Sequence, residues 1–167
     1  ALTFKSVDNA LITGTLGTIS EAESNYAIEL HLGTNDKQSL YTIEFEPHRN
    51  SIELYRSTAD GARTPITEVS SDLSRWHNGE HQPTFALFYK DGSFDLRLDD
   101  QPALSYTDTS EHRHTGINRV GIASWEAIYQ AKPLQVKENP RFITATAGQD
   151  GAWLEEHVVA QPNNMHI

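Results

Sequence analysis

Carboxylate, hydroxyl and guanidinium groups occupy every second position of several apolar segments. Successive side chains of a strand point to opposite faces, so each such set should lie on one polar face. The sets are Glu29 and His31 in residues 26–33, Thr42, Glu44 and Glu46 in residues 39–46, Glu53 and Tyr55 in residues 51–57, and Asp95 and Arg97 in residues 93–99. If these strands are neighbours in one sheet, they form a surface suited to polyols, because carboxylates accept hydrogen bonds from hydroxyls, Arg donates them and rings stack on sugars. A solvated sheet face would explain the same alternation.

Aromatic and imidazole side chains gather in two turn-rich segments. Residues 74–82, "SRWHNGEHQ", carry Trp76, His77 and Glu80, and residues 123–129, "ASWEAIY", carry Trp125, Glu126 and Tyr129. Trp beside hydrogen-bonding groups is typical of a small-ligand cleft, so these six residues predict a second candidate site at the loop end of the fold. The alternative role of each Trp is to close the end of the core.

Catalytic signatures are weak in this sequence. Pairs drawn from Glu29, Glu44, Glu53 and Asp95 could reach the roughly 5–9 Å separation of glycosidase carboxylates, but any acidic sheet offers such pairs. There is no G-x-S-x-G elbow, no P-loop and no G-x-G-x-x-G sequence. We therefore assign no catalytic residue and favour a non-catalytic binding domain, with a glycan-active hydrolase or lyase and a structural or adhesive domain as alternatives.

The amino-acid composition argues against several classes of partner and cofactor. The 167 residues contain 23 acidic and 13 basic side chains, and the net charge of −10 argues against nucleic acid and anionic membranes. The sequence contains no cysteine, which excludes disulfides, thiolate catalysis and zinc–thiolate sites. No cofactor is expected to be required. A structural calcium ion stays open, although the sequence has no D-x-D-x-D-G loop to place it.

The start of the chain bears on where the protein works. It begins at Ala1 without Met or a signal peptide, which predicts either a processed secreted or extracellular protein or a module of a larger multidomain protein. Bacterial secreted proteins often lack cysteine, so the composition is compatible with a bacterial source.

The elements that must position these residues are strands, and no stretch keeps a helical period over three turns. Asp91-Gly92, between alternating apolar residues, predicts a tight hairpin that places Phe94 inside. We predict strands at residues 10–16, 26–33, 39–46, 51–57, 64–70, 83–90, 93–99, 103–108, 118–125, 133–138 and 141–147. Short strands at this spacing indicate an all-β fold, a jelly-roll sandwich of two antiparallel sheets.

One domain should span residues 1–149, with residues 150–167 as an extension in which residues 152–160 either form a short docked helix or lie along an edge of the sandwich, before a frayed tail at residues 161–167. The predicted core positions are Ile28, Leu30, Ile43, Phe45, Ile52, Leu54, Phe85, Leu87, Phe94, Leu96, Val120 and Ile122.

Residues 40–125 resemble the concanavalin A-like lectin/glucanase sandwiches, in particular laminin-G-like and levanase-associated carbohydrate-binding modules. The resemblance is carried by "YTIEFEPHRNSIELYR", Trp76, "FALFYKDGSFDLRLDDQPALSYTD" and "RVGIASW". It covers about half of the chain and consists of structural hairpins. It implies a jelly-roll sandwich and recognition of an oligosaccharide or polysaccharide by a non-catalytic module.

Two weaker likenesses add little. "YAIELHLGTNDKQS" and "FALFYKDGSF" are similar to the domain named after farnesoic acid O-methyltransferase, but Leu32-Gly33-Thr34-Asn35 departs from that family's G-G-x-x-N pattern and no methyl-donor site is visible. "FEPHRN" is similar to the galectin strand motif without its spacing partners, so we set this likeness aside.

Overall fold

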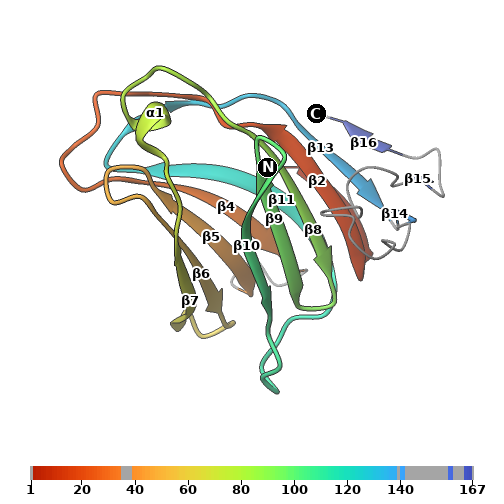
Figure 1. The fold of residues 1–167 in the computed structure, drawn as a ribbon. Coiled ribbons are helices and arrows are strands. Elements are labelled where there is room, and N and C mark those ends of the chain that lie inside the picture. The colour runs from red at the N-terminus through yellow and green to blue at the C-terminus, as the bar shows by residue number, and fades with distance from the viewer. Residues whose placement is uncertain (1, 35–38, 139, 142–157, 160–163, 167) are drawn as a thin grey trace, which may run out of the picture.

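The chain folds into a sandwich of two curved antiparallel sheets (Figure 1). The computed structural model describes residues 2–34, 39–138, 140–141, 158–159 and 164–166. Sheet A contains, in spatial order, β1 (Leu2–Val7), β11 (Ile117–Trp125), β4 (Ala27–Gly33), β5 (Leu40–Glu46), β6 (Ser51–Ser57) and β7 (Arg63–Ser70). Sheet B contains β10 (Gln101–Thr107), β9 (Ser93–Leu98), β8 (Thr84–Lys90), β2 (Asn9–Thr15), β13 (Leu134–Glu138) and β16 (Asn164–His166).

Smaller elements complete the described structure. Two short pairs join β12 (Ile128–Gln130) to β3 (Thr18–Ser20) and β14 (Pro140–Arg141) to β15 (Val158–Val159). Helix α1 (Ser74–His77) is a single turn within the segment that sequence analysis left as a loop.

The predicted β-sandwich is confirmed, and so are the strands from residues 10–16 to residues 133–138, with their ends slightly shifted. The predicted core is also confirmed, with Ile122 partly buried. Sequence analysis missed β1, β3 and β12, and it predicted a frayed tail where β16 pairs with β13. Most of the predicted strand 141–147 and most of the predicted helix 152–160 lie outside the described residues. The described part of the latter segment, Val158–Val159, is strand, so the helix prediction was wrong there.

The hairpin of β8 and β9 forms as the sequence predicts. Asp91 and Gly92 both have positive φ angles, 49° and 87°, as a type I′ turn requires. Phe94 consequently points into the core, where its ring meets Tyr41 edge-on at 4.7 Å and Tyr89 at 5.3 Å between ring centroids. This aromatic cluster joins the two sheets.

A buried polar network closes one end of the sandwich. Asp108 Oδ2 accepts hydrogen bonds from the Tyr41 hydroxyl at 2.8 Å and from Arg56 at 2.6 Å. Asp108 Oδ1 accepts from the backbone N–H of Ser110, and the Tyr41 hydroxyl accepts from the backbone N–H of His114. The network therefore ties the connection between β10 and β11 to sheet A.

Strands β7 and β10 lie at the edges of their sheets and share a local irregularity. In β7, Leu54 pairs with Thr67 but Tyr55 pairs with Pro65, so β7 has one extra residue, Ile66. In β10, Ala103 is the extra residue, directly after Pro102. Each extra residue packs against the core, so both edges combine a proline with a β-bulge.

Candidate functional site

Three glutamates stand side by side on the outer face of sheet A. The register pairs Glu29 of β4 with Glu44 of β5, and Glu44 with Glu53 of β6. Directly opposed residues of antiparallel strands have Cβ atoms only about 4.5–5.5 Å apart, so their carboxyl groups interact. We call these three residues the acidic row. The predicted parity placed each of them on this face, opposite the buried residues of the same strands.

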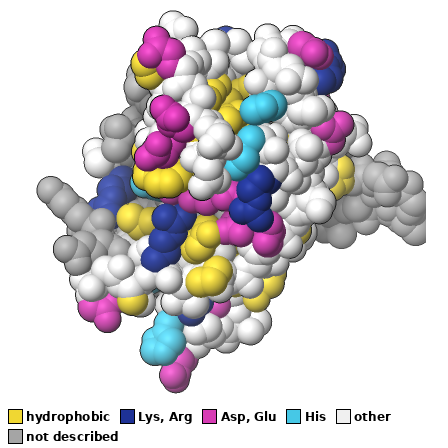
Figure 2. Space-filling view, turned by 90° about the vertical axis from the view of Figure 1, so that its left-hand side faces the viewer, with side chains coloured by type: hydrophobic (Ala, Val, Ile, Leu, Met, Phe, Trp, Pro, Cys, Tyr) yellow, Lys and Arg dark blue, Asp and Glu magenta, His cyan; other side chains and the backbone are white. Residues whose placement is uncertain are grey.

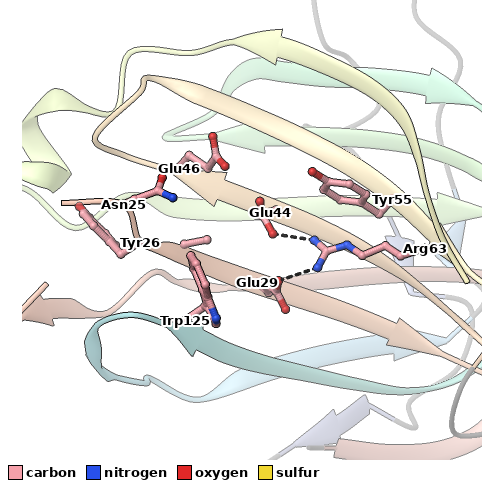
Figure 3. A pocket seen from close by; sticks show the side chains of 9 residues that line it. Asn25, Tyr26, Glu29, Glu44, Glu46, Tyr55, Arg63 and Trp125 are labelled. Carbon is pink, nitrogen blue, oxygen red and sulfur yellow. Dashed lines mark hydrogen bonds and ion pairs between the residues drawn. The ribbon is translucent and has the colours of Figure 1, made fainter. Parts of the chain in front are cut away.

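Arg63 lies beside the acidic row, and its positive charge reduces the repulsion between the carboxylates of Glu29 and Glu44. It begins edge strand β7, and its guanidinium is 2.6 Å from Glu44 Oε2 and 3.4 Å from Glu29 Oε1. The same group lies 3.9 Å above the centre of the Tyr55 ring, within the range of a cation–π contact. Figure 3 shows Arg63 reaching from beside Tyr55 toward the two carboxylates.

A pocket of about 400 Å³ opens beside these groups. Figure 2 shows acidic and basic side chains meeting in the middle of this side of the molecule, beside hydrophobic ones. The residues that line the pocket are Asn25, Tyr26, Ala27, Glu29, Glu44, Glu46, Tyr55, Arg63 and Trp125. Trp125 stands opposite Ala27 in the register of β11 and β4, and it is 55% exposed. The pocket thus has carboxylates along its floor, Arg63 and Tyr55 at one end and an accessible indole at the other (Figure 3).

Hydrogen bonds fix the end of the pocket near Trp125. The Tyr26 hydroxyl is 2.8 Å from His77 Nδ1, and the two rings stack with centroids 5.9 Å apart. His48 holds the side-chain oxygen of Asn25 at 3.0 Å. Glu46 accepts a hydrogen bond from Ser51 at 3.0 Å and pairs with Arg49 at 2.7 Å, so its carboxylate is held in place at the rim.

The acidic row holds a proton near neutral pH. Burial, followed by the hydrogen bond with Glu29, raises the pKa of Glu44 to about 7. A hydrogen bond from His31, 2.7 Å away, is the main reason that the pKa of Glu29 is lowered to about 2. Below about pH 7 the two carboxyls therefore share one proton. The pair can then both donate to and accept from a ligand hydroxyl.

The free energy of unfolding should depend on pH through the titration of Glu44 and Glu29. Unfolded Glu titrates near 4.5, so Glu44 stabilises the folded state fully below that pH and loses the effect as pH rises through about 7. Glu29 has the opposite sign, because its stabilisation is present above 4.5 and is lost as pH falls toward about 2. We expect the free energy of unfolding to fall by roughly 1–3 kcal/mol between about pH 5 and about pH 8. Urea unfolding at the two pH values measures this difference.

Glu44→Gln provides the control for that measurement, because Gln cannot titrate. The fall should be much smaller in this variant, with Glu53, whose pKa burial also raises, accounting for the remainder. An unchanged fall in Glu44→Gln would show that the proton is held elsewhere.

Asp95 and Arg97 do not join this surface. Both lie on β9, in sheet B, and the register leaves no strand of sheet A beside β9. The expectation of one shared face with Glu44, Glu53 and Tyr55 was therefore wrong, since alternation fixes the face of a strand but not its sheet. Arg97 is largely buried and donates to the backbone oxygen of Asp100 at 3.0 Å. Asp95 lines a separate hollow of about 250 Å³ on the outer side of sheet B.

The six residues of the predicted loop site do not all lie in the pocket. Trp76 is 3% exposed, donates its indole N–H to the backbone oxygen of Gly17 at 2.8 Å and packs edge-on against Phe45, so it closes the core. Tyr129 is only partly exposed, and its hydroxyl accepts from the N–H of Gly17. His77 supports Tyr26, while Glu80 and Glu126 are exposed and do not line the pocket. Trp125 lines it, so part of the predicted loop site and part of the predicted face site form one pocket.

Sequence analysis missed Asn25, Tyr26 and Arg63. The predicted strand began at residue 64, which left Arg63 in a turn with no face assigned. Asn25 and Tyr26 lie directly before β4, where alternation gives little signal. Glu29 and His31 lie on the face that alternation predicted, and of the two only Glu29 lines the pocket.

Metal binding finds no support in the described part of the chain. No three or more His, Asp or Glu side chains there are grouped so that they could hold an ion. The calcium expectation thus has no candidate ligands among the described residues. In the same residues no helix has the length and apolar character of a membrane span.

Comparisons with known proteins support the fold. No protein-family model and no curated protein sequence matches the chain. Among solved structures, it is similar to carbohydrate-binding module CBM66 from Bacillus subtilis, with 16% identity over 75% of this chain and 73% of the other and a TM-score of 0.58. It is also similar to sheep galectin-11 in complex with glycerol, with 8% identity over 81% and 98% of the two chains and a TM-score of 0.56.

A third neighbour is CG-16, a homodimeric agglutinin from chicken liver, with 10% identity, coverage of 81% and 96%, and a TM-score of 0.54. At these identities the likeness establishes a shared sandwich fold and no common site residues. Galectins therefore share the fold, although the "FEPHRN" likeness had been set aside. The neighbours do not confirm membership of the concanavalin A-like superfamily or a link to the farnesoic acid O-methyltransferase domain.

Proposed function

We propose that this protein is a non-catalytic glycan-binding domain whose ligand occupies the pocket on sheet A. The observation that carries the proposal is that Trp125, an exposed indole, lines one cavity of about 400 Å³ together with Glu29 and Glu44 of the acidic row; Glu53, the third member of the row, does not line it. An indole face suits the C–H face of a sugar, and carboxylates accept hydrogen bonds from its hydroxyls. That structural neighbours include a carbohydrate-binding module and lectins supports the same class of ligand.

The pocket suits a short oligosaccharide segment, not a ligand with a large contact surface. Glu29, Glu44 and Glu46 are held by hydrogen bonds or ion pairs before any ligand arrives, so little ordering is needed on their side. The pocket is open to solvent, and sugars exchange their hydrogen bonds with water for those with the protein. We therefore expect micromolar to millimolar dissociation constants, about 4–8 kcal/mol of binding free energy.

Glycoside hydrolysis is the alternative function, because Glu29 and Glu44 form a carboxyl pair with shifted pKa values. However, Glu29 and Glu44 are directly opposed in the register of β4 and β5, where such pairs have Cβ atoms only about 4.5–5.5 Å apart. A retaining glycosidase needs roughly 5 Å between its carboxyls, and an inverting one more, so that the scissile bond or a water fits between them. Arg63 also bridges the two groups. Incubation with the bound glycan should therefore release no reducing sugar, and release that stops in Glu44→Gln would establish an enzyme instead.

Trp125→Ala is the sharpest test of the binding proposal. Loss of the stacking surface should weaken glycan binding about tenfold or more, since ~1.4 kcal/mol corresponds to tenfold in affinity. The ligand should first be identified by screening β-glucan, fructan, galactan and alginate oligosaccharides, and the affinities then measured by calorimetric titration.

Ile128→Ala is the matched control, because Ile128 of β12 is 54% exposed and does not line the pocket. Its affinity should equal that of the wild type. Equal losses in Trp125→Ala and Ile128→Ala, or no loss in either, would place the glycan elsewhere on the protein. A secreted or extracellular location and a place in a larger multidomain protein remain part of this proposal.

A further inference from the structure

The surroundings of Arg63 have the chemistry of a binding site for an organic cation. An aromatic face lies 3.9 Å below its guanidinium, and carboxylate oxygens lie 2.6 and 3.4 Å away on β5 and β4. Stacking on a ring combined with charge-assisted hydrogen bonds to carboxylates is how proteins hold guanidinium and ammonium groups. Here the cation comes from the chain itself, and its side chain is 42% exposed.

Arg63 also balances the charge of the pocket. Arg49, between β5 and β6, pairs with Glu46 and Glu68 at 2.7 and 3.4 Å and does not line the pocket. Among the residues that line the pocket, Glu29 and Glu44 face Arg63, so its removal would leave two carboxyl groups and the Tyr55 ring without their cation. Because Arg63 begins an edge strand, this change does not interrupt a strand that has neighbours on both sides.

We propose that Arg63 fills a cation subsite of the pocket with a group of its own chain and thereby makes the pocket selective for uncharged glycans over amino-sugar glycans. The selectivity part of this inference rests on the proposed function, whereas the existence of the subsite does not. An ammonium group on a sugar would meet the guanidinium of Arg63 in the wild-type pocket. In its absence the ammonium would meet the Tyr55 face and the two carboxylate oxygens that Arg63 contacts in the wild type, Glu29 Oε1 and Glu44 Oε2.

The subsite can be tested without any glycan. Titration of Arg63→Ala with ethylguanidinium should show saturable binding by calorimetry and a rise in melting temperature, because the small cation replaces the missing group. Ethylurea has the same shape without the charge and should give neither effect. Arg49→Ala is the matched control, since the described structure records a cation–π contact for Arg63 and none for Arg49. Ethylguanidinium should bind Arg49→Ala at least about tenfold more weakly than Arg63→Ala, because the place left by Arg49 offers no aromatic ring contact.

The selectivity is tested with two β-1,4-linked tetramers, cellotetraose and the glucosamine tetramer, which differ in having a hydroxyl or an ammonium group at carbon 2. Arg63→Ala should bind the glucosamine tetramer at least about tenfold more tightly than the wild type does, with no such gain for cellotetraose. Equal gains for both tetramers, or none for the glucosamine tetramer, would overturn the selectivity. Ethylguanidinium binding no tighter in Arg63→Ala than in Arg49→Ala would overturn the subsite. A wild type that binds no glycan in the screen contradicts the proposed function and leaves the ethylguanidinium result decisive for the subsite.

Discussion

Asp108→Ala is expected to lower the free energy of unfolding by about 3–5 kcal/mol, which is what loss of one partner of a buried ion pair typically costs. The Asp108 side chain is 3% exposed, and its loss leaves Arg56 largely buried without a counter-ion. Burial alone would raise the pKa of Asp108, but hydrogen bonds from Tyr41, Ser110 and Arg56 together hold it below its usual range, which indicates that the charged form is the one stabilised. Urea unfolding at neutral pH measures the loss.

Glu68→Ala is the control for this variant. Glu68 also pairs with an arginine, Arg49, at 3.4 Å, but both partners are about half exposed. Exposed ion pairs contribute about 1 kcal/mol or less, so the change in unfolding free energy should be small. If Asp108→Ala lost no more stability than Glu68→Ala, the polar network at the end of the sandwich would not be what holds the connection between β10 and β11.

Phe94→Ala should have an effect of similar size for a different reason. Phe94 is fully buried between the sheets and packs edge-on against Tyr41 and Tyr89, so its truncation leaves a cavity that the two rings cannot fill by small movements. Such changes cost about 3–5 kcal/mol. Thermal and urea unfolding should both report it, with an unchanged circular dichroism spectrum below the transition.

Ile128→Ala serves again as the comparison, because it removes a similar apolar group from an exposed position of β12. Its unfolding free energy should stay within about 0.5 kcal/mol of the wild type. Equal stabilities of Phe94→Ala and Ile128→Ala would mean that the two faces of β9 had been assigned the wrong way round.

The architecture was largely readable from local patterns. Alternation marked both faces of β4, β5 and β6, and the Asp91-Gly92 turn fixed the register of β8 and β9, because a two-residue hairpin leaves no freedom in pairing. Two of the missed strands are β1, at the start of the chain, where no preceding turn marks a boundary, and β12, whose three residues are too few to show a pattern. The helical turn at Trp76 was also missed, since a single turn carries no period.

The site was only partly readable, because it depends on which strands become neighbours. Glu44, Glu53 and Tyr55 do share one face, since consecutive hairpins put β5 and β6 side by side, but Glu53 does not line the pocket. Asp95 and Arg97 were assigned to the same surface although the long connection through α1 carries the chain to the other sheet. Trp125 reaches the pocket because β11, distant in sequence, pairs with β4. Non-local pairings of this kind leave no trace in a local pattern.

The edge strands β7 and β10 bear on whether copies of the protein can pair with one another. An uninterrupted outer strand offers its backbone to any extended chain, including another copy of the protein, and this route leads to aggregation. In β7 and β10 a proline followed by an extra residue breaks the regular spacing of backbone donors and acceptors that such templating needs. Arg63 starts one of these strands, so the pocket lies next to a protected edge. Under the proposed function, copies of the protein bound side by side on one polysaccharide would not pair with one another through these two edges.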